Sequence, residues 1–116
     1  MLAPLFHELI GAQLSAVTFV MDYLQLQFDG RTINVFNPLT IMTEAGSIQS
    51  WNPGFRDLLC SQITKKVKEV QIMDGEKLLL FFEDLSEIHI SLKEEDYTCA
   101  EAIYAFGFSD HQWCVI

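Results

Sequence analysis

The segment Tyr23–Phe36 constrains the fold of this chain most, because its pattern is that of a β-hairpin in a single register. Apolar and polar residues alternate through Leu24–Phe28 and again through Thr32–Val35, the period of strands with one buried face. Asp29-Gly30 separates the two strands and suits the positive φ angles of a tight hairpin turn. The pairs that this two-residue loop predicts are Leu24 with Val35, Gln25 with Asn34, Leu26 with Ile33 and Gln27 with Thr32.

Further strands are predicted from the same alternation or from apolar runs bounded by turn residues. Five consecutive apolar residues, Leu78–Phe82, indicate a strand that is covered on both faces. Tyr97–Phe106 is the best helix candidate, because three of its apolar residues fall on one stripe and Gly107 follows as a stop. The other predicted elements are strands at Leu39–Thr43, Ser47–Trp51, Glu87–Leu92 and Gln112–Ile116, and one or two helical turns at Phe55–Cys60.

The length of 116 residues is that of one domain, so we predict a single domain over residues 1–116. Residues 10–36 and 59–92 share a similar order of apolar positions. This similarity indicates either a degenerate internal repeat or a chance likeness between two strand-rich segments. The predicted fold class is α+β and predominantly antiparallel β, with two β-meanders forming a sandwich or a partly closed barrel and up to three short helices.

The net charge of −9 comes entirely from residues 69–116. Residues 1–68 carry five acids and five bases, whereas residues 69–116 carry eleven acids and only two bases, Lys77 and Lys93. Such an asymmetry costs stability through self-repulsion and raises the rate at which a cationic partner is captured. Acids serve solubility alone in many soluble proteins, but evenly spread acids would serve it equally well. The asymmetry therefore favours a binding role.

The acidic charge also excludes classes of partner. Nucleic-acid binding depends on Lys and Arg that neutralise phosphates, and anionic membrane surfaces attract polybasic segments, so we expect neither nucleic acid nor membrane as a partner. Met1–Val20 is fairly apolar but lacks the basic start of a secretion signal. The three cysteines, Cys60, Cys99 and Cys114, have no close pairs, which is typical of reduced thiols packed in a core. We therefore expect a cytoplasmic protein.

The sequence contains no recognisable catalytic or metal-binding motif. Its cysteines and histidines lack the spacing of a zinc site, and it has no nucleophile elbow, phosphate loop or dinucleotide fingerprint. His89 lies between Glu87 and Ser91 on the polar side of its strand, where a solvated surface histidine is the simplest interpretation. We predict no enzyme, no catalytic residue, no metal and no cofactor, with a small enzyme that uses His89 and Cys99 as an alternative.

Six of the eleven acids of residues 69–116 form two clusters at the ends of the predicted strand Glu87–Leu92. One cluster is at or near the turn before this strand, and the other follows the strand at its far end. A strand of about six residues spans roughly 20 Å, so the two clusters need not form one patch. Tyrosines beside the acids are candidate anchors, because buried aromatic residues carry much of the binding energy of interfaces. The predicted partner-binding residues are Glu83, Asp84, Glu87, Glu94, Glu95, Asp96, Tyr97 and Tyr104, with Trp113 as a weaker candidate.

The segment Asp22–Gly30 leads to Asn37-Pro38, and a second meander and a terminal strand with Trp113 follow later in the chain. In these features the chain resembles small bacterial proteins of uncharacterised function and, more loosely, immunity proteins of contact-dependent growth inhibition systems. The resemblance covers most of the chain and is one of architecture, so no functional residue is transferred from it. It implies a role, which is to bind and neutralise a co-encoded toxin, often a basic nuclease.

Charge and resemblance together predict an immunity protein that neutralises a cognate, basic toxin domain of nuclease type through an acidic C-terminal surface. Carboxylates can mimic the phosphates that such a toxin binds, and oppositely charged pairs associate quickly. We expect a monomer or a weak homodimer. The alternative is a non-enzymatic structural or regulatory binding module, homo-oligomeric through a sheet edge.

Overall fold

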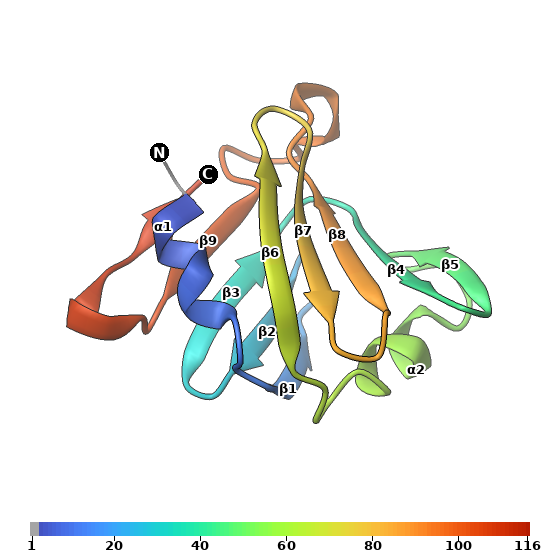
Figure 1. Ribbon diagram of the computed structural model, residues 1–116. Coiled ribbons are helices and arrows are strands. Elements are labelled where there is room, and N and C mark those ends of the chain that lie inside the picture. Colours follow the sequence, from blue (N-terminus) through green and yellow to red (C-terminus); the bar gives the residue numbers. More distant parts are fainter. Residues whose placement is uncertain (1–2) are drawn as a thin grey trace.

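The computed structural model describes residues 3–116, which are dominated by antiparallel strands (Figure 1). The helical elements are α1 (Ala3–Phe6), α2 (Phe55–Cys60) and the 3-10 turns η1 (His7–Leu9), η2 (Glu94–Asp96) and η3 (Ser109–His111). The strands are β1 (Leu14–Phe19), β2 (Leu24–Phe28), β3 (Arg31–Val35), β4 (Leu39–Thr43), β5 (Gly46–Gln49), β6 (Val67–Met73), β7 (Lys77–Phe82), β8 (Glu87–Ser91), β9 (Ile103–Phe106) and β10 (Cys114–Val115). The predominance of antiparallel strands agrees with the predicted fold class.

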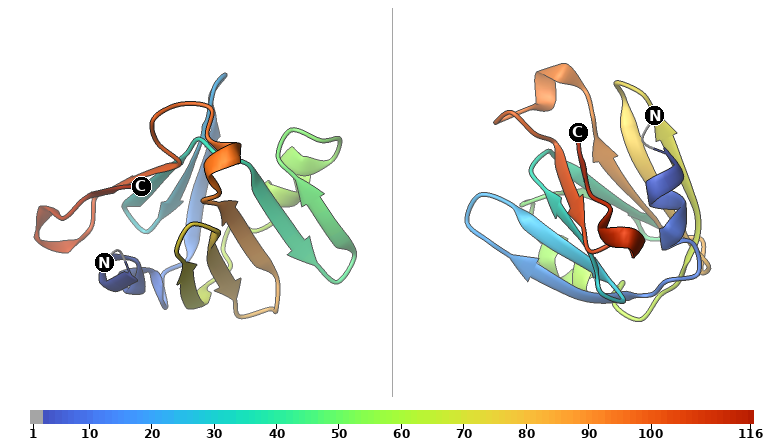
Figure 2. Two further views of the ribbon diagram at one scale, coloured as in Figure 1. Left: turned by 90° about the horizontal axis from the view of Figure 1, so that it is seen from above. Right: turned by 90° about the vertical axis from the view of Figure 1, so that its left-hand side faces the viewer.

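The strands form two five-stranded sheets that pack against each other and do not close into a barrel (Figures 1 and 2). The first sheet has the order β1-β2-β3-β9-β10, and the second has the order β5-β4-β8-β7-β6. Their facing sides share one apolar core, in which Leu26 and Ile33 of the first sheet and Leu80 and Ile88 of the second are fully buried. Of the two predicted arrangements, the open sandwich describes the structure and the partly closed barrel does not.

The hairpin β2–β3 has the predicted register. The pairs Leu24–Val35, Gln25–Asn34, Leu26–Ile33 and Gln27–Thr32 are all present. Asp29 and Gly30 form the turn with φ angles of 52° and 94°, as a tight hairpin loop requires. Local pattern and turn chemistry therefore suffice to fix this part of the first sheet.

Strand β7 is buried along its core face and only partly buried along its outer face, so the structure confirms in part what its continuous apolar run predicted. Leu78 and Leu80 point into the core and are fully buried. Leu79 points to the outer face of the second sheet but is only 5% exposed, because it lies between Gln71 of β6 and His89 of β8. Strand β7 lies between β6 and β8, so side chains of both neighbours flank Leu79 and Phe81 on the outer face.

The predicted helix at Tyr97–Phe106 is wrong. Residues 97–102 cross from one sheet to the other without regular structure, and Ile103–Phe106 forms β9 between β3 and β10. The odd-numbered residues of β9 are fully buried in the core, and the even-numbered residues point outward. Pairing with β3, which is distant in the sequence, overrides the short helical stripe.

Gly107 ends β9 at a close approach to the β2–β3 turn and does not cap a helix. Its φ angle is +81°, and a Cβ atom at this position would lie 2.7 Å from the carbonyl oxygen of Gly30. Only glycine combines this backbone conformation with this contact.

The prediction that all three cysteines pack in the core is also wrong. Cys60 lies on the exposed side of α2, whose other side buries Phe55 and Leu59, and Cys99 is exposed in the loop after η2. Cys114 is half-buried in β10, and this burial raises the pKa of its thiol. The core is filled by larger apolar side chains instead.

The short helical segments complete the core at the sides of the sandwich (Figure 2). The segment α1–η1 packs against β6 and contributes the buried residues Phe6 and Leu9. Helix α2 packs against β1 and β4 and contributes Phe55 and Leu59. Within residues 3–116, no helix has the length and apolar character needed to cross a membrane.

The two halves of the chain have the same order of elements. Each contains a helical segment, a three-stranded meander and a hairpin that joins the sheet of the other half. The halves meet at an antiparallel bridge between Gln13 and Lys66. Matching hydrogen bonds of 2.9 Å flank this bridge, from Leu14 N–H to the oxygen of Lys65 and from Val67 N–H to the oxygen of Ala12. The internal repeat at residues 10–36 and 59–92 stays a prediction about the sequence, and its two segments occupy equivalent places in the sheets.

Candidate functional site

The predicted acidic residues lie at the two ends of β8. Glu83 and Asp84 are in the β7–β8 turn, and η2 lies beyond the other end of the strand (Figure 1). The β6–β7 turn lies beside η2, because the Leu92 N–H donates to the carbonyl oxygen of Glu76 at 2.8 Å. This turn adds two acids that the sequence did not single out. We call the resulting group the acidic end, which consists of Asp74, Glu76, Glu94, Glu95 and Asp96.

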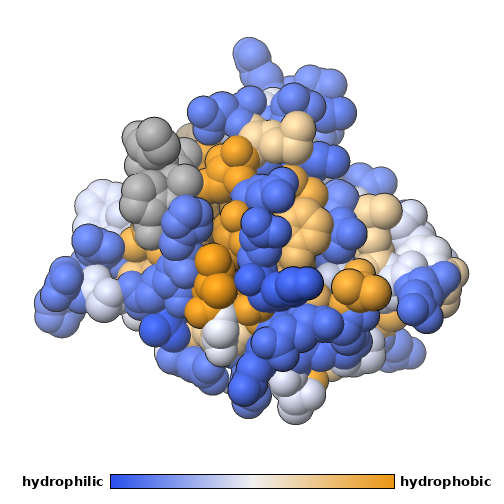
Figure 3. Space-filling model, viewed as in Figure 1, coloured by the Kyte–Doolittle hydropathy of each residue, from blue (hydrophilic) through white to orange (hydrophobic). Residues whose placement is uncertain are grey.

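The acidic end keeps its negative charge. The surface over the β6–β7 turn and η2 is largely hydrophilic (Figure 3). Four of the five acids are exposed, and Asp96 is half-buried and accepts a hydrogen bond from the Ser91 hydroxyl. None of the ion pairs in the described part of the chain involves any of the five. Lys77 and Lys93 lie in the same region and leave it with a net negative charge.

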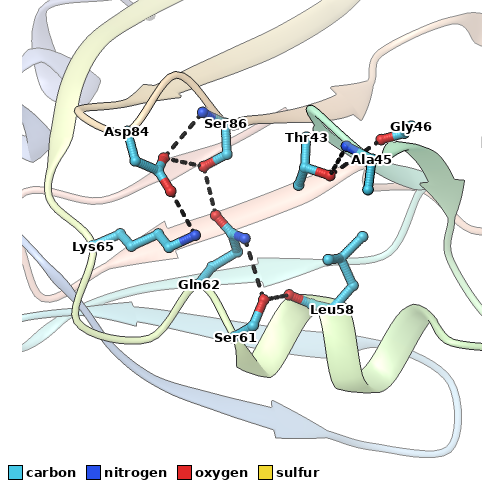
Figure 4. Close-up of polar contacts among 9 residues, drawn as sticks. All are labelled: Thr43, Ala45, Gly46, Leu58, Ser61, Gln62, Lys65, Asp84 and Ser86. Carbon is cyan, nitrogen blue, oxygen red and sulfur yellow. Dashed lines mark hydrogen bonds and ion pairs between the residues drawn. The ribbon is translucent and has the colours of Figure 1, made fainter.

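The β7–β8 turn differs from the acidic end, because one of its two acids, Asp84, forms an ion pair (Figure 4). The Lys65 ammonium lies 2.6 Å from the Asp84 carboxylate, and the Ser86 N–H donates to the other carboxylate oxygen at 3.0 Å. The Ser86 hydroxyl also lies 2.7 Å from Oε1 of the fully buried Gln62. Partial burial raises the pKa of Asp84, but the hydrogen bonds from Lys65 and Ser86 outweigh it and lower this pKa to about 2. Asp84 thus links the β7–β8 turn to Lys65, in the segment that precedes β6.

Glu87 is also engaged, on the outer face of the second sheet. Its carboxylate oxygen lies 2.8 Å from Nε2 of His89, whose side chain is 17% exposed. His89 is therefore less solvated than the sequence indicated. It lines a cavity of about 250 Å³ between the sheet and the acidic end, together with Thr40, Lys77 and other residues. The Ser91 hydroxyl on the same strand bonds to Asp96 and not to His89, so this group does not form a hydrogen-bonded Ser–His pair.

The two predicted tyrosine anchors do not share one surface. Tyr97 follows η2, is half-buried and packs against the core. Tyr104 lies on β9 and points to the outer face of the first sheet, where it contacts Trp113 at a ring-centroid distance of 6.5 Å. The structure thus brings together Glu94, Glu95 and Asp96, and places Glu83 and Asp84 at the other end of β8.

Sequence analysis missed a group of aromatic residues around Tyr104. Five aromatic side chains point to the outer face of the first sheet, and Trp113 is 67% exposed. The signal was present for two of them, because the hairpin register already placed Tyr23 and Phe36 on the polar side. The mistaken helix concealed the others. We call this surface the aromatic face, which consists of Tyr23, Phe36, Tyr104, Phe106 and Trp113.

The described residues offer no group of three or more His, Cys, Asp or Glu side chains that could hold a metal ion. Residues 3–116 instead present a cluster of carboxylates that make no ion pair among themselves or with the other described residues, and a group of aromatic side chains on one sheet face. Both are features of surfaces that bind other molecules.

Comparison with known proteins adds no relative to this description. No protein-family model, no curated protein and no solved structure matches the chain.

Proposed function

We propose that this chain is a cytoplasmic immunity protein without enzymatic activity, which binds and neutralises a basic toxin domain of nuclease type. The acidic end is the surface that first meets the cationic partner. Carboxylates there stand in for the phosphates that such a toxin binds in its nucleic acid substrate.

The observation that carries this proposal is that the acids of the acidic end make no ion pair with any residue that the structure describes. A folded protein gains little from like charges gathered at one place, because their mutual repulsion opposes folding. Glu94 and Glu95 are exposed and make no ion pair in the described structure. A partner that brings Lys or Arg to this surface would relieve the repulsion and would also be steered toward it.

The β7–β8 turn supports the proposal less well. Asp84 already has its counter-charge in Lys65, and Glu87 is paired with His89. These residues are better explained by folding than by binding. We therefore assign the capture of the partner to Glu94, Glu95 and their neighbours in the acidic end.

The test begins with purification of the tagged protein from its native host, followed by expression of the captured protein alone to ask whether it is basic and toxic. The association rate of the pair is then measured at low salt. The variant carries Glu94→Lys and Glu95→Lys, which leave the Asp96–Ser91 hydrogen bond in place. We expect association to slow by about tenfold or more, with a smaller difference at high salt.

The matched control carries Glu44→Lys and Asp57→Lys, an equal change of charge at two exposed acids of the neutral half. It should slow association much less. Equal slowing by both variants would show that only net charge matters and would remove the acidic end from the mechanism. A captured partner that is neither basic nor toxic, or capture of only a second copy of this chain, would contradict the proposed function.

A further inference from the structure

The aromatic face is an ordered surface and not a scatter of single residues. Tyr104 lies next to both Phe106 and Trp113, with ring centroids 5.1 Å and 6.5 Å apart. Tyr23 and Phe36 form a second pair at 5.1 Å. The figures show no helix over this side of the first sheet (Figure 2). Trp113 is the most exposed of the five residues, and the other four are half-buried, so a partner would meet Trp113 first.

The sandwich does not require aromatic residues at these positions. Strand β9 pairs with β3 as β4 pairs with β8, so each position of the first sheet has an equivalent in the second. The five residues Tyr23, Phe36, Tyr104, Phe106 and Trp113 correspond in register to Lys77, Ser91, Thr40, Met42 and Ser47. The same backbone arrangement thus carries no aromatic residue at these five positions of the second sheet, which points to a binding role for the aromatic ones.

The charges at this face are one-sided. Arg31 is the only charged residue within the strands of the first sheet, and its Nε atom donates to Oε2 of Glu8 at 2.6 Å. Asp22 lies beside Tyr23 and Phe36, with which it lines a cavity of about 550 Å³. The face therefore offers aromatic rings and the Asp22 carboxylate, and the strands of the first sheet carry no Lys or Arg other than the paired Arg31. This combination is complementary to a cation, since the faces of Trp, Tyr and Phe attract guanidinium groups.

A buried amide marks the middle of the same face. Asn34 lies in register between Gln25 and Tyr104 and is 9% exposed. Its Oδ1 atom has no hydrogen-bond partner within the described structure. An unpaired buried acceptor is costly, and a guanidinium carries several N–H donors that could satisfy such a group.

We propose that the aromatic face binds an arginine-bearing segment of the basic partner, with Trp113 and Tyr104 stacking on guanidinium groups. This inference rests on the proposed function and gives the partner a second point of contact. The acidic end then governs how fast the partner arrives, and the aromatic face governs how long it stays.

The probe is an oligo-arginine peptide, titrated into the isotope-labelled protein and followed by NMR. A Trp51→Phe variant assigns the two indole signals, because Trp51 belongs to a separate aromatic cluster beside α2. We expect shifts of the Trp113 indole and of the backbone amides of Asn34 and Tyr104. Trp113→Ala should weaken binding by about fivefold or more, whereas Trp113→Phe should retain most of it.

The outcomes separate this inference from the proposed function. Shifts confined to Glu94–Asp96, with the aromatic face unchanged, would overturn the inference and leave the proposed function standing. Equal shifts with a glycine–serine peptide of the same length, or shifts that depend only on protein concentration, would show a neutral ligand or a second copy and would overturn it too. No shift at either surface would count against both proposals. Trp113 is mostly exposed, so its replacement should not unfold the protein.

Discussion

Replacing Asp84 with asparagine tests whether the β7–β8 turn serves the fold. The substitution keeps the size of the side chain and removes the negative charge that holds Lys65 at 2.6 Å. The Ser86 N–H can still donate to the remaining amide oxygen, so the geometry of the turn is largely preserved. What is lost is the preference of the folded state for the ionised carboxylate.

The size of the loss follows from the pKa of Asp84, which falls from 3.8 to about 2 on folding. By linkage, a shift of this size corresponds to roughly 2.4 kcal/mol of stability. The Asp84 side chain is 43% exposed, so solvent screening reduces the expected contribution to about 1 kcal/mol. Because the folded pKa is lowered, this stability is present above pH about 4 and is lost as the pH falls toward about 2.

Urea unfolding of the wild-type protein and of Asp84→Asn between about pH 2 and pH 7 measures the effect. The variant should be less stable by about 1 kcal/mol at neutral pH, and the difference should shrink toward zero near pH 2. Glu83→Gln serves as the control, because Glu83 is exposed and has no ion-pair partner in the described structure. A difference of the same size at pH 2 and pH 7 would refute the electrostatic reasoning, and no difference at pH 7 would refute the structural role.

Three further substitutions test the packing of the fold. Gly107→Ala should destabilise the protein by at least about 2 kcal/mol, measured by urea unfolding, because its Cβ would lie 2.7 Å from a carbonyl oxygen at a φ of +81°. Glu8→Gln should lower the free energy of unfolding by about 1 kcal/mol at neutral pH and by less in acid, because hydrogen bonds from Ser109 and Arg31 lower the pKa of Glu8. Urea unfolding at neutral and at acidic pH measures this difference. Leu80→Ala should cost about 2–5 kcal/mol in thermal unfolding, whereas Leu85→Ala, at a position 72% exposed, should cost about 0.5 kcal/mol or less.

Local signals in the sequence predicted the parts of the fold that depend on neighbouring residues. The hairpin β2–β3 could be placed to the residue, because alternation and the Asp29-Gly30 turn agree on one register. The apolar run of β7 and the helical turns at Phe55–Cys60 were likewise found where they were predicted. In these segments, residues within about ten positions of one another in the sequence are enough to predict the secondary structure.

Elements that depend on distant partners could not be predicted in this way. Strand β9 is only four residues long, and it exists because β3 and β10 flank it. A stripe of apolar residues at helical spacing looked stronger than an alternation over so short a segment. Cys99 was assigned to the core for a different reason, the general tendency of cysteine to be buried, and the structure places it in an exposed loop.

The candidate site shows the same division. The position of Glu94–Asp96 beyond β8 followed from the strand pattern. The approach of the β6–β7 turn, which adds Asp74 and Glu76, required the hydrogen bond from Leu92 to be seen. The neutralisation of Asp84 by Lys65 was equally invisible, since the sequence does not say which lysine reaches which turn.

The exchange of hairpins between the two halves has a consequence for how the chain can be divided. Strands β4 and β5 complete the sheet built by the second half, and β9 and β10 complete the sheet built by the first. A cut in the turn at Trp51–Gly54 would therefore give two fragments that each lack the two strands completing their own sheet and that should reassemble only on mixing. Such fragments would make a split reporter whose signal depends on the concentration of both pieces.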